Sequence, residues 1–135
     1  MKKIIFIIGI VLLLCGCKKI NVSKIDSLKA IKENRDNINS VQVIRFTELG
    51  SFCYDVDSLV AYNLFNNISY VKEEGIRVTD DGTTYIFNMN EKGRVVLNFE
   101  GNYLIYKNHS YLLGGFHHLN IDDMKEVSCE WLLFL

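Results

Sequence analysis

The sequence of 135 residues contains no proline, no internal repeat and no low-complexity tract. These absences exclude a Pro-rich linker, a polyproline II ligand segment and a repeat array. Neither sign of charge dominates, because 15 lysines and arginines stand against 16 aspartates and glutamates. The lack of a basic run argues against nucleic acid as a partner. With 49% apolar and 23% charged residues, the chain is long enough for one folded domain and too short for two.

The sequence also lacks the short motifs that carry common chemistries. There is no Gly-x-Ser-x-Gly, no Ser-x-x-Lys with partners, no His-Glu-x-x-His, no phosphate loop and no dinucleotide fingerprint. We therefore expect a protein that is not an enzyme and that uses no cofactor. An exported cysteine protease built on Cys53 and a histidine is the competing idea, but a domain this small leaves little room for a substrate cleft beside a core.

What the chain does contain begins with a targeting segment over residues 1–17. The first three residues are positively charged, and residues 4–14 form an unbroken apolar run of 11 residues that two lysines soon follow. Signal peptides have apolar regions of about 7–15 residues, whereas a membrane-spanning helix needs about 20. The segment therefore reads as a signal peptide and not as a permanent span.

The end of this segment resembles the lipobox of bacterial lipoproteins. That motif has an aliphatic residue at −3, a small residue at −1 and a cysteine at +1 that receives a diacylglyceryl group. With Cys15 at +1, the −1 residue would be the bulky Leu14. With Cys17 at +1, Gly16 lies at −1 and Leu14 at −3, which fits. The resemblance implies a signal peptide over residues 1–16 and lipidation of Cys17; the alternative is an ordinary secretory signal with an incidental cysteine.

Lipidation would decide where the protein works. Each buried CH₂ of a lipid chain contributes about 0.8 kcal/mol and one chain alone holds weakly, so two or three acyl chains on Cys17 would anchor it stably. The mature chain, residues 17–135, keeps 13 basic against 16 acidic side chains. We expect a lipid anchor in the cell membrane or outer membrane, with the domain outside the cytoplasm. The partners would be membrane lipid, through acylated Cys17, and an unknown envelope or extracellular protein.

Residues 17–39 follow the anchor and are mostly polar. Within them Ile25, Leu28 and Ile31 have helical spacing. This pattern fits a short helix with Ser23 as its N-cap, and it fits equally well a tether that lifts the domain from the lipid surface.

A single α+β domain is expected over residues 40–135. Residues 40–49 read as a strand, and residues 55–75 as an amphipathic helix that Asp55 or Asp57 begins and Gly75 ends. From residue 76 onward, apolar and polar residues alternate with a period of two. This alternation predicts an antiparallel meander whose strands lie within residues 75–79, 83–90, 94–100, 103–107 and 110–114.

The faces of this sheet and the last element follow from the same patterns. Two sets of apolar residues should each share one sheet face; they are Tyr85, Phe87 and Met89, and Val95, Leu97 and Phe99. Residues 120–135 have helical spacing and end in "WLLFL", which should dock in the core or, alternatively, bind a partner. The order is β-α-β-β-β-β-α, with a mainly antiparallel sheet packed on one or two amphipathic helices.

Several residue groups are candidates for chemistry. Cys53 and Cys129 remain after the signal is removed and form either a disulfide or two buried thiols. His117-His118 could ligate zinc or copper, but neighbours on an extended segment point in opposite directions, and His109 cannot be placed near them. We therefore expect a surface connection there and no metal. Two acidic groups look like calcium-loop fragments, and helix capping and turns explain them better; they are Asp55–Asp57 and Asp80–Gly82.

The whole layout resembles the small uncharacterised lipoproteins of bacteria: a lipobox, a strand, an amphipathic helix and a meander ending in an "NYLIYKNHSYL"-like hairpin. This resemblance implies no activity. We expect a non-enzymatic lipoprotein that binds another macromolecule; the alternatives are an immunity or inhibitor protein against a toxin or hydrolase, and a small envelope enzyme or metal-binding protein. Aromatic residues become candidate contacts if they face outward, namely Tyr85, Phe87, Tyr103, Tyr106 and Tyr111.

Overall fold

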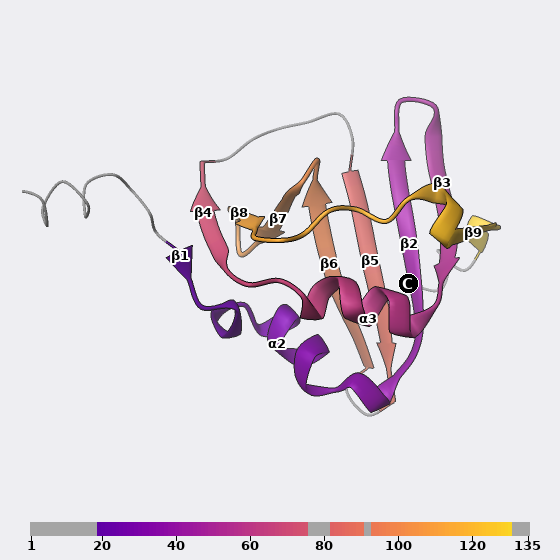
Figure 1. The fold of residues 1–135 in the computed structure, drawn as a ribbon. Helices are drawn as coiled ribbons and strands as arrows, with labels where there is room; N and C mark the ends of the chain where they lie inside the picture. The colour runs from indigo at the N-terminus through magenta and orange to yellow at the C-terminus, as the bar shows by residue number, and fades with distance from the viewer. Residues whose placement is uncertain (1–18, 76–81, 91–92, 131–135) are drawn as a thin grey trace, which may run out of the picture.

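The structure is a computed structural model that describes residues 19–75, 82–90 and 93–130. These residues form one antiparallel sheet of nine strands in the order β1-β4-β8-β7-β6-β5-β2-β3-β9. Two α-helices and the extended segment 114–120 lie across the same face of the sheet (Figure 1). The expected α+β class is confirmed.

The strands are β1 (Lys19–Ile20), β2 (Ile38–Thr47), β3 (Gly50–Val56), β4 (Val71–Glu74), β5 (Gly82–Met89), β6 (Gly93–Glu100), β7 (Tyr103–Tyr106), β8 (His109–Leu113) and β9 (Met124–Val127). The α-helices are α2 (Asp26–Glu33) and α3 (Ser58–Asn66). Short 3₁₀ turns are η1 (Val22–Lys24), η2 (Arg35–Asn37) and η3 (Ile121–Asp123).

The middle of the sheet follows the expected strands. The strand expected over residues 40–49 is β2, and β5 to β8 form the antiparallel meander. Lys107 and Asn108 have φ of 49° and 64°, the positive values that a two-residue hairpin turn requires between β7 and β8. The strand expected over residues 75–79 lies almost wholly outside the described residues.

The core lies between the sheet and the two helices. Tyr85, Phe87 and Met89 are buried on the covered face, as are Leu97 and Phe99, so the expected shared faces are confirmed. Helix α3 inserts Phe65, which has no exposed surface, among four aromatic rings; these are Tyr85, Phe87, Phe99 and Phe116.

Helix α2 packs against this core. Ile25, Leu28 and Ile31 are at most 1% exposed, so this segment belongs to the packed domain and is not a tether. The expected short helix is confirmed, but Ser23 is not its N-cap. Ser23 lies in η1, where its N–H donates to Asn21 Oδ1 (3.0 Å), and the α2 N-cap position is Ile25.

Helix α3 is shorter than the helix expected over residues 55–75. Asp57 begins it, because Asp57 Oδ1 accepts the Leu59 N–H at 2.9 Å. The helix ends at Asn66, and the residues of β4 then pair with β8 instead of forming a last helical turn. The expected helix is therefore wrong over residues 55–56, which belong to β3, and over residues 67–75, and Gly75 does not end it.

Backbone pairing explains why the chain after α3 is extended. Ser69 N–H donates to Gly114 O at 3.0 Å, and Gly114 N–H donates to Tyr70 O at 2.8 Å. A Cβ on Gly114 would collide with the Tyr70 ring, so only glycine allows this close approach. This pairing extends the β4–β8 ladder by one step, and residues distant in sequence determine it.

The C-terminal part also differs from expectation. In the described part of residues 120–135, the helical residues are limited to 3₁₀ turns, and β9 pairs with β3, a strand that the sequence patterns did not predict. The helix expected over residues 120–135 is therefore wrong for that part. Residues 131–135, which include "WLLFL", lie outside the described residues.

The opposite sheet face carries a second, smaller apolar cluster. Ile44, Cys53 and Ile86 are buried there, and Val127 and Cys129 pack against them. Cys53 and Cys129 are joined by a disulfide, with their Cα atoms 5.4 Å apart. The bond fixes the chain just after β9 to β3, and it leaves Cys53 without the free thiol that a cysteine protease needs.

Candidate functional site

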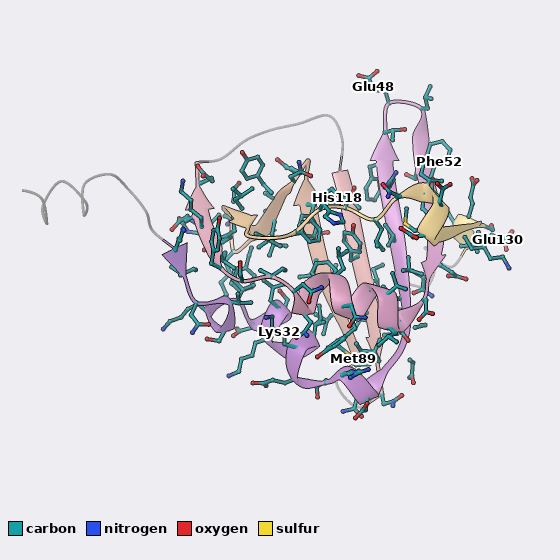
Figure 2. All side chains as sticks on the ribbon, in the orientation of Figure 1. Lys32, Glu48, Phe52, Met89, His118 and Glu130 are labelled. Carbon is teal, nitrogen blue, oxygen red and sulfur yellow. A yellow bond between two sulfur atoms is a disulfide. The ribbon has the colours of Figure 1, made fainter. Side chains whose placement is uncertain are left out.

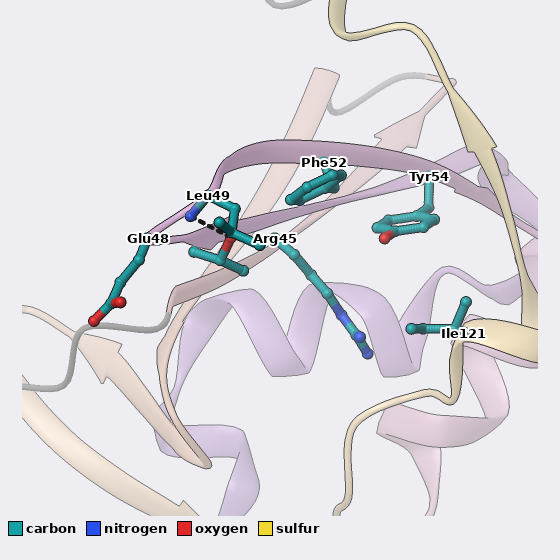
Figure 3. Close-up of a pocket in the computed structure, with 7 residues that line it drawn as sticks. Arg45, Glu48, Leu49, Phe52, Tyr54 and Ile121 are labelled. Atoms are coloured by element: carbon teal, nitrogen blue, oxygen red, sulfur yellow. Dashed lines mark hydrogen bonds between the residues drawn. The ribbon is translucent and has the colours of Figure 1, made fainter.

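A pocket of about 630 Å³ lies at the end of the β2–β3 hairpin, beside η3. The alternation of β2 places Val41, Val43 and Arg45 on the covered face, so Arg45 occupies a position where the strand otherwise presents apolar side chains. Register pairs Arg45 with Phe52 of β3, and Val43 with Tyr54. The hairpin therefore places Arg45 and two aromatic rings, Phe52 and Tyr54, in the lining of one pocket (Figure 3).

Arg45 extends from β2 towards Ile121 (Figure 3). One Nη donates to Leu119 O at 2.7 Å, and the guanidinium carbon lies 5.9 Å from the centre of the Tyr54 ring, within cation–π range. Among the described residues, no carboxylate forms an ion pair with Arg45. A guanidinium carries five N–H donors and accepts nothing, so donors remain for a ligand that brings its own acceptors.

The rim of the pocket is exposed and is apolar except for Thr47 and the acidic Glu48 at the hairpin tip. Leu49, at the hairpin tip, is 91% exposed, and Ile121 is 59% exposed. The Thr47 hydroxyl is held within the tip, because it donates to Gly50 O and accepts the Leu49 N–H, both at 3.2 Å. The pocket thus combines a half-buried cation and largely apolar walls with a rim that carries two exposed apolar side chains and one carboxylate.

His118 fastens the segment 114–120 over the sheet (Figure 2). Its Nε2 lies 2.6 Å from Gly101 O, and its Nδ1 lies 2.8 Å from the Tyr85 hydroxyl. A carbonyl oxygen only accepts, so Nε2 carries the hydrogen and Nδ1 accepts the Tyr85 O–H. Both ring nitrogens are therefore engaged, and this histidine has no lone pair left for a metal ion.

The surroundings of His118 keep its ring neutral. Burial lowers the pKa of His118, and the nearby Arg45 and His117 lower it further, against an opposing effect of the Gly101 hydrogen bond. Burial also raises the pKa of Tyr85 to about 12. A neutral imidazole and a protonated phenol are the forms that this hydrogen bond requires.

This pair predicts a loss of stability in mild acid. In the unfolded chain the pKa of histidine returns to about 6.5, so below that value the unfolded state binds more protons than the folded state. The free energy of unfolding should therefore fall as the pH drops through 6.5 towards the lowered pKa of His118, and this contribution should level off below it. Urea unfolding midpoints measured from pH 7.5 to 5 will give the slope.

Matched variants separate His118 from other titrating groups. His117→Gln, at the exposed neighbouring position, should keep most of the slope, because His117 is the smallest of the effects that lower the pKa of His118. His118→Gln should be less stable at pH 7.5 and should show a smaller slope between pH 7 and 5. An undiminished slope in His118→Gln would assign the acid sensitivity to other groups.

The structure places the other candidate residues apart from this pocket. Cys17 lies outside the described residues. Tyr85 and Phe87 are buried in the core and are not outward contacts, whereas Tyr103, Tyr106 and Tyr111 are half-buried. The described residues include no group of three or more His, Cys, Asp or Glu side chains that could hold a metal ion.

The remaining histidines and acidic groups have local roles. His109 Nδ1 lies 2.7 Å from Glu73 Oε1, at the surface. Asp57 caps α3, and Asp55 is exposed in β3. Asp80 and Asp81 lie outside the described residues.

Sequence reasoning missed Arg45, and it considered His118 only as a possible metal ligand in a surface connection, whereas the ring is partly buried and bonded on both nitrogens. For Arg45 a signal was available, because it breaks the apolar alternation begun by Val41 and Val43. His118 gave no such signal, because its partners, Tyr85 and Gly101, are 33 and 17 residues away.

No family model, no curated protein and no solved structure matches this chain. Across the described ranges, no helix is both long enough and apolar enough to cross a membrane.

Proposed function

We propose that the protein is a lipid-anchored cell-envelope lipoprotein whose domain is a non-enzymatic binding module, with the Arg45 pocket as its contact site. The observation that carries this proposal is the half-buried Arg45, whose guanidinium lies beside Tyr54 in a pocket also lined by Phe52, with donors that no described carboxylate satisfies. The lipobox-like sequence ending at Cys17 supports the anchor.

The chemistry of the pocket indicates what its occupant carries. Aromatic walls favour an apolar side chain, and Arg pairs with a carboxylate through two parallel N–H···O bonds. The partner would therefore be an envelope or extracellular protein that presents a carboxylate next to an apolar group. A secreted toxin or hydrolase with such a group would make this protein an immunity or inhibitor protein.

Photo-crosslinking from the hairpin tip tests the proposal. A photoreactive amino acid at Leu49 in the membrane-bound protein should capture one reproducible partner, whose affinity is then measured. Arg45→Gln should weaken binding about tenfold or more, because losing one member of a desolvated charge pair costs about 2–5 kcal/mol. Arg94→Gln is the matched control, because Arg94 is exposed on β6 and its neighbour Val95 faces the core.

A second variant is needed because Arg45 also donates a hydrogen bond to Leu119 O, so that Arg45→Gln could weaken binding by disturbing the fold. Leu49→Asp changes only the exposed tip, so it should weaken binding without moving the urea midpoint. Binding that is unchanged in both Arg45→Gln and Leu49→Asp would remove the pocket from the contact surface. A measured catalytic turnover with no reproducible partner would overturn the binding function.

A further inference from the structure

Positive charge gathers at one edge of the domain. Residues 19–35 hold five basic side chains and two acidic ones, whereas residues 120–130 hold one basic and four acidic. The first segment contains β1, η1 and α2, and the second contains η3 and β9. Since β1 and β9 are the two outer strands of the sheet, the domain has a basic edge and an acidic edge.

Four lysines make up the basic edge: Lys19, Lys24, Lys29 and Lys72. They come from β1, η1, α2 and β4, which Figure 1 shows together at one end of the molecule. Lys24 and Lys29 are exposed, and no described carboxylate pairs with either. Lys19 is exposed over the Tyr70 ring and lies opposite Lys72 in the β1–β4 register. Lys72 is half-buried and pairs with Glu74 of the same strand at 3.3 Å, so its charge is partly offset. Lys24 and Lys29 could therefore bind an anionic partner without breaking any contact among the described residues.

The same edge lies next to the proposed anchor. Lys19 follows Cys17 by two residues, and an extended chain spans at most about 3.6 Å per residue. Two residues of chain therefore span at most about 7 Å. A lipid on Cys17 would bring the basic edge to the headgroups.

The pocket lies towards the other side of the sheet. From β1 to β2 there are six steps in the strand order, and each step is about 4.8 Å, so β2 lies roughly 30 Å from the anchored edge. A domain resting on its basic edge would hold the Arg45 pocket away from the membrane.

We infer that Lys19, Lys24, Lys29 and Lys72 form a membrane-contact surface for anionic phospholipid headgroups, which orients the lipidated domain with its pocket outward. The inference rests on the proposed lipid anchor. Lysines close to an anionic surface are attracted to it, and salt weakens this attraction because it screens exposed charges.

Lysine footprinting on vesicles tests the surface. The mature protein is isolated from membranes, and mass spectrometry of its N-terminus establishes whether Cys17 is acylated. It is then reconstituted in phosphatidylcholine vesicles with or without phosphatidylglycerol and treated with an amine-acylating reagent. In the anionic vesicles, Lys24 and Lys29 should be acylated at about one third of their rate in pure phosphatidylcholine vesicles, or more slowly still. Salt at 1 M, where the screening length is about 3 Å, should remove this protection.

Lys125 in β9 is the control within the same molecule and should react equally in both kinds of vesicle. The double variant Lys24→Gln/Lys29→Gln should also lose the protection of Lys19, whereas Lys125→Gln should keep it. Equal reactivity of Lys24 and Lys29 in the two vesicles would overturn the surface and leave the anchor intact. An unacylated Cys17 would overturn the anchor; flotation of that protein with anionic vesicles would then support the surface alone, and no flotation would overturn both.

Discussion

Replacing Phe65 by alanine should lower the free energy of unfolding by about 3–5 kcal/mol, the range for removing a large aromatic side chain from a packed core. Phe65 has no exposed surface, and its ring centre lies 5.1 Å from that of Tyr85 and 5.3 Å from that of Phe116. It therefore joins three parts of the covered face: helix α3, the central strands and the segment 114–120. Urea unfolding followed by circular dichroism will measure the loss.

Leu59→Ala is the matched control, because Leu59 lies in the same helix and is 46% exposed. It should cost less than about 1 kcal/mol, since little apolar surface is returned to water. Similar losses for Phe65→Ala and Leu59→Ala would show that α3 does not pack on the sheet through Phe65.

Removing the disulfide should have an effect of similar size. Cys53 and Cys129 are 76 residues apart, and a crosslink over a loop of that length contributes about 4 kcal/mol in the chain-entropy model, mainly by restricting the unfolded chain. The double variant Cys53→Ala/Cys129→Ala should therefore unfold at a clearly lower urea concentration. It should also weaken the attachment of β9, whose four residues pair with β3 alone.

Two controls make this prediction specific. Ser128→Ala, an exposed change beside Cys129, should leave the midpoint unchanged. Thiol counting on the denatured mature protein should find neither Cys53 nor Cys129 free unless reductant is added. Two free thiols without reductant would contradict the disulfide.

Local patterns were sufficient for the meander of β5 to β8, in which neighbours in sequence are also neighbours in the sheet. They were not sufficient for β3, which was not expected although it follows β2 in sequence and pairs with it. The alternation from Tyr85 to Met89 and from Val95 to Phe99 predicted the faces of β5 and β6, because each strand pairs with the next along the chain. The turn at Asn108 was predictable for the same reason. In this region the hydrophobic period and the turn chemistry indicate the same structure.

The errors at residues 67–75 and 120–130 lie in segments whose structure is determined by pairing with residues distant in sequence. Ile68 and Val71 continue the helical spacing of the preceding apolar residues and are buried. Val71, however, lies in β4 and pairs with β8, and Ile68 directly precedes the two residues that bond to Gly114. Met124 and Val127 likewise fit a helix as well as a strand, and the pairing of β9 with β3 and the disulfide at Cys129 determine the outcome. Apolar spacing alone cannot separate these alternatives in short segments.

The candidate site was predictable only in part. That Arg45 interrupts an apolar strand face is visible in the sequence, and a charge at such a position is a reason to look for a partner. The walls of its pocket were not predictable, because Phe52 and Tyr54 belong to a strand that was not expected. Ile121 and Leu119 reach the pocket only because the chain crosses the whole sheet after β8.

Among the described residues, the two outer strands of the sheet are β1, with two residues, and β9, with four, and each carries an exposed lysine. Outer strands with free backbone groups tend to join those of neighbouring molecules, and short length and charge oppose this. Confinement to a bilayer would raise the local concentration of an anchored domain and hold its copies in similar orientations. Short, lysine-bearing edges would then keep the copies separate in a crowded layer, leaving each pocket open to a different protein.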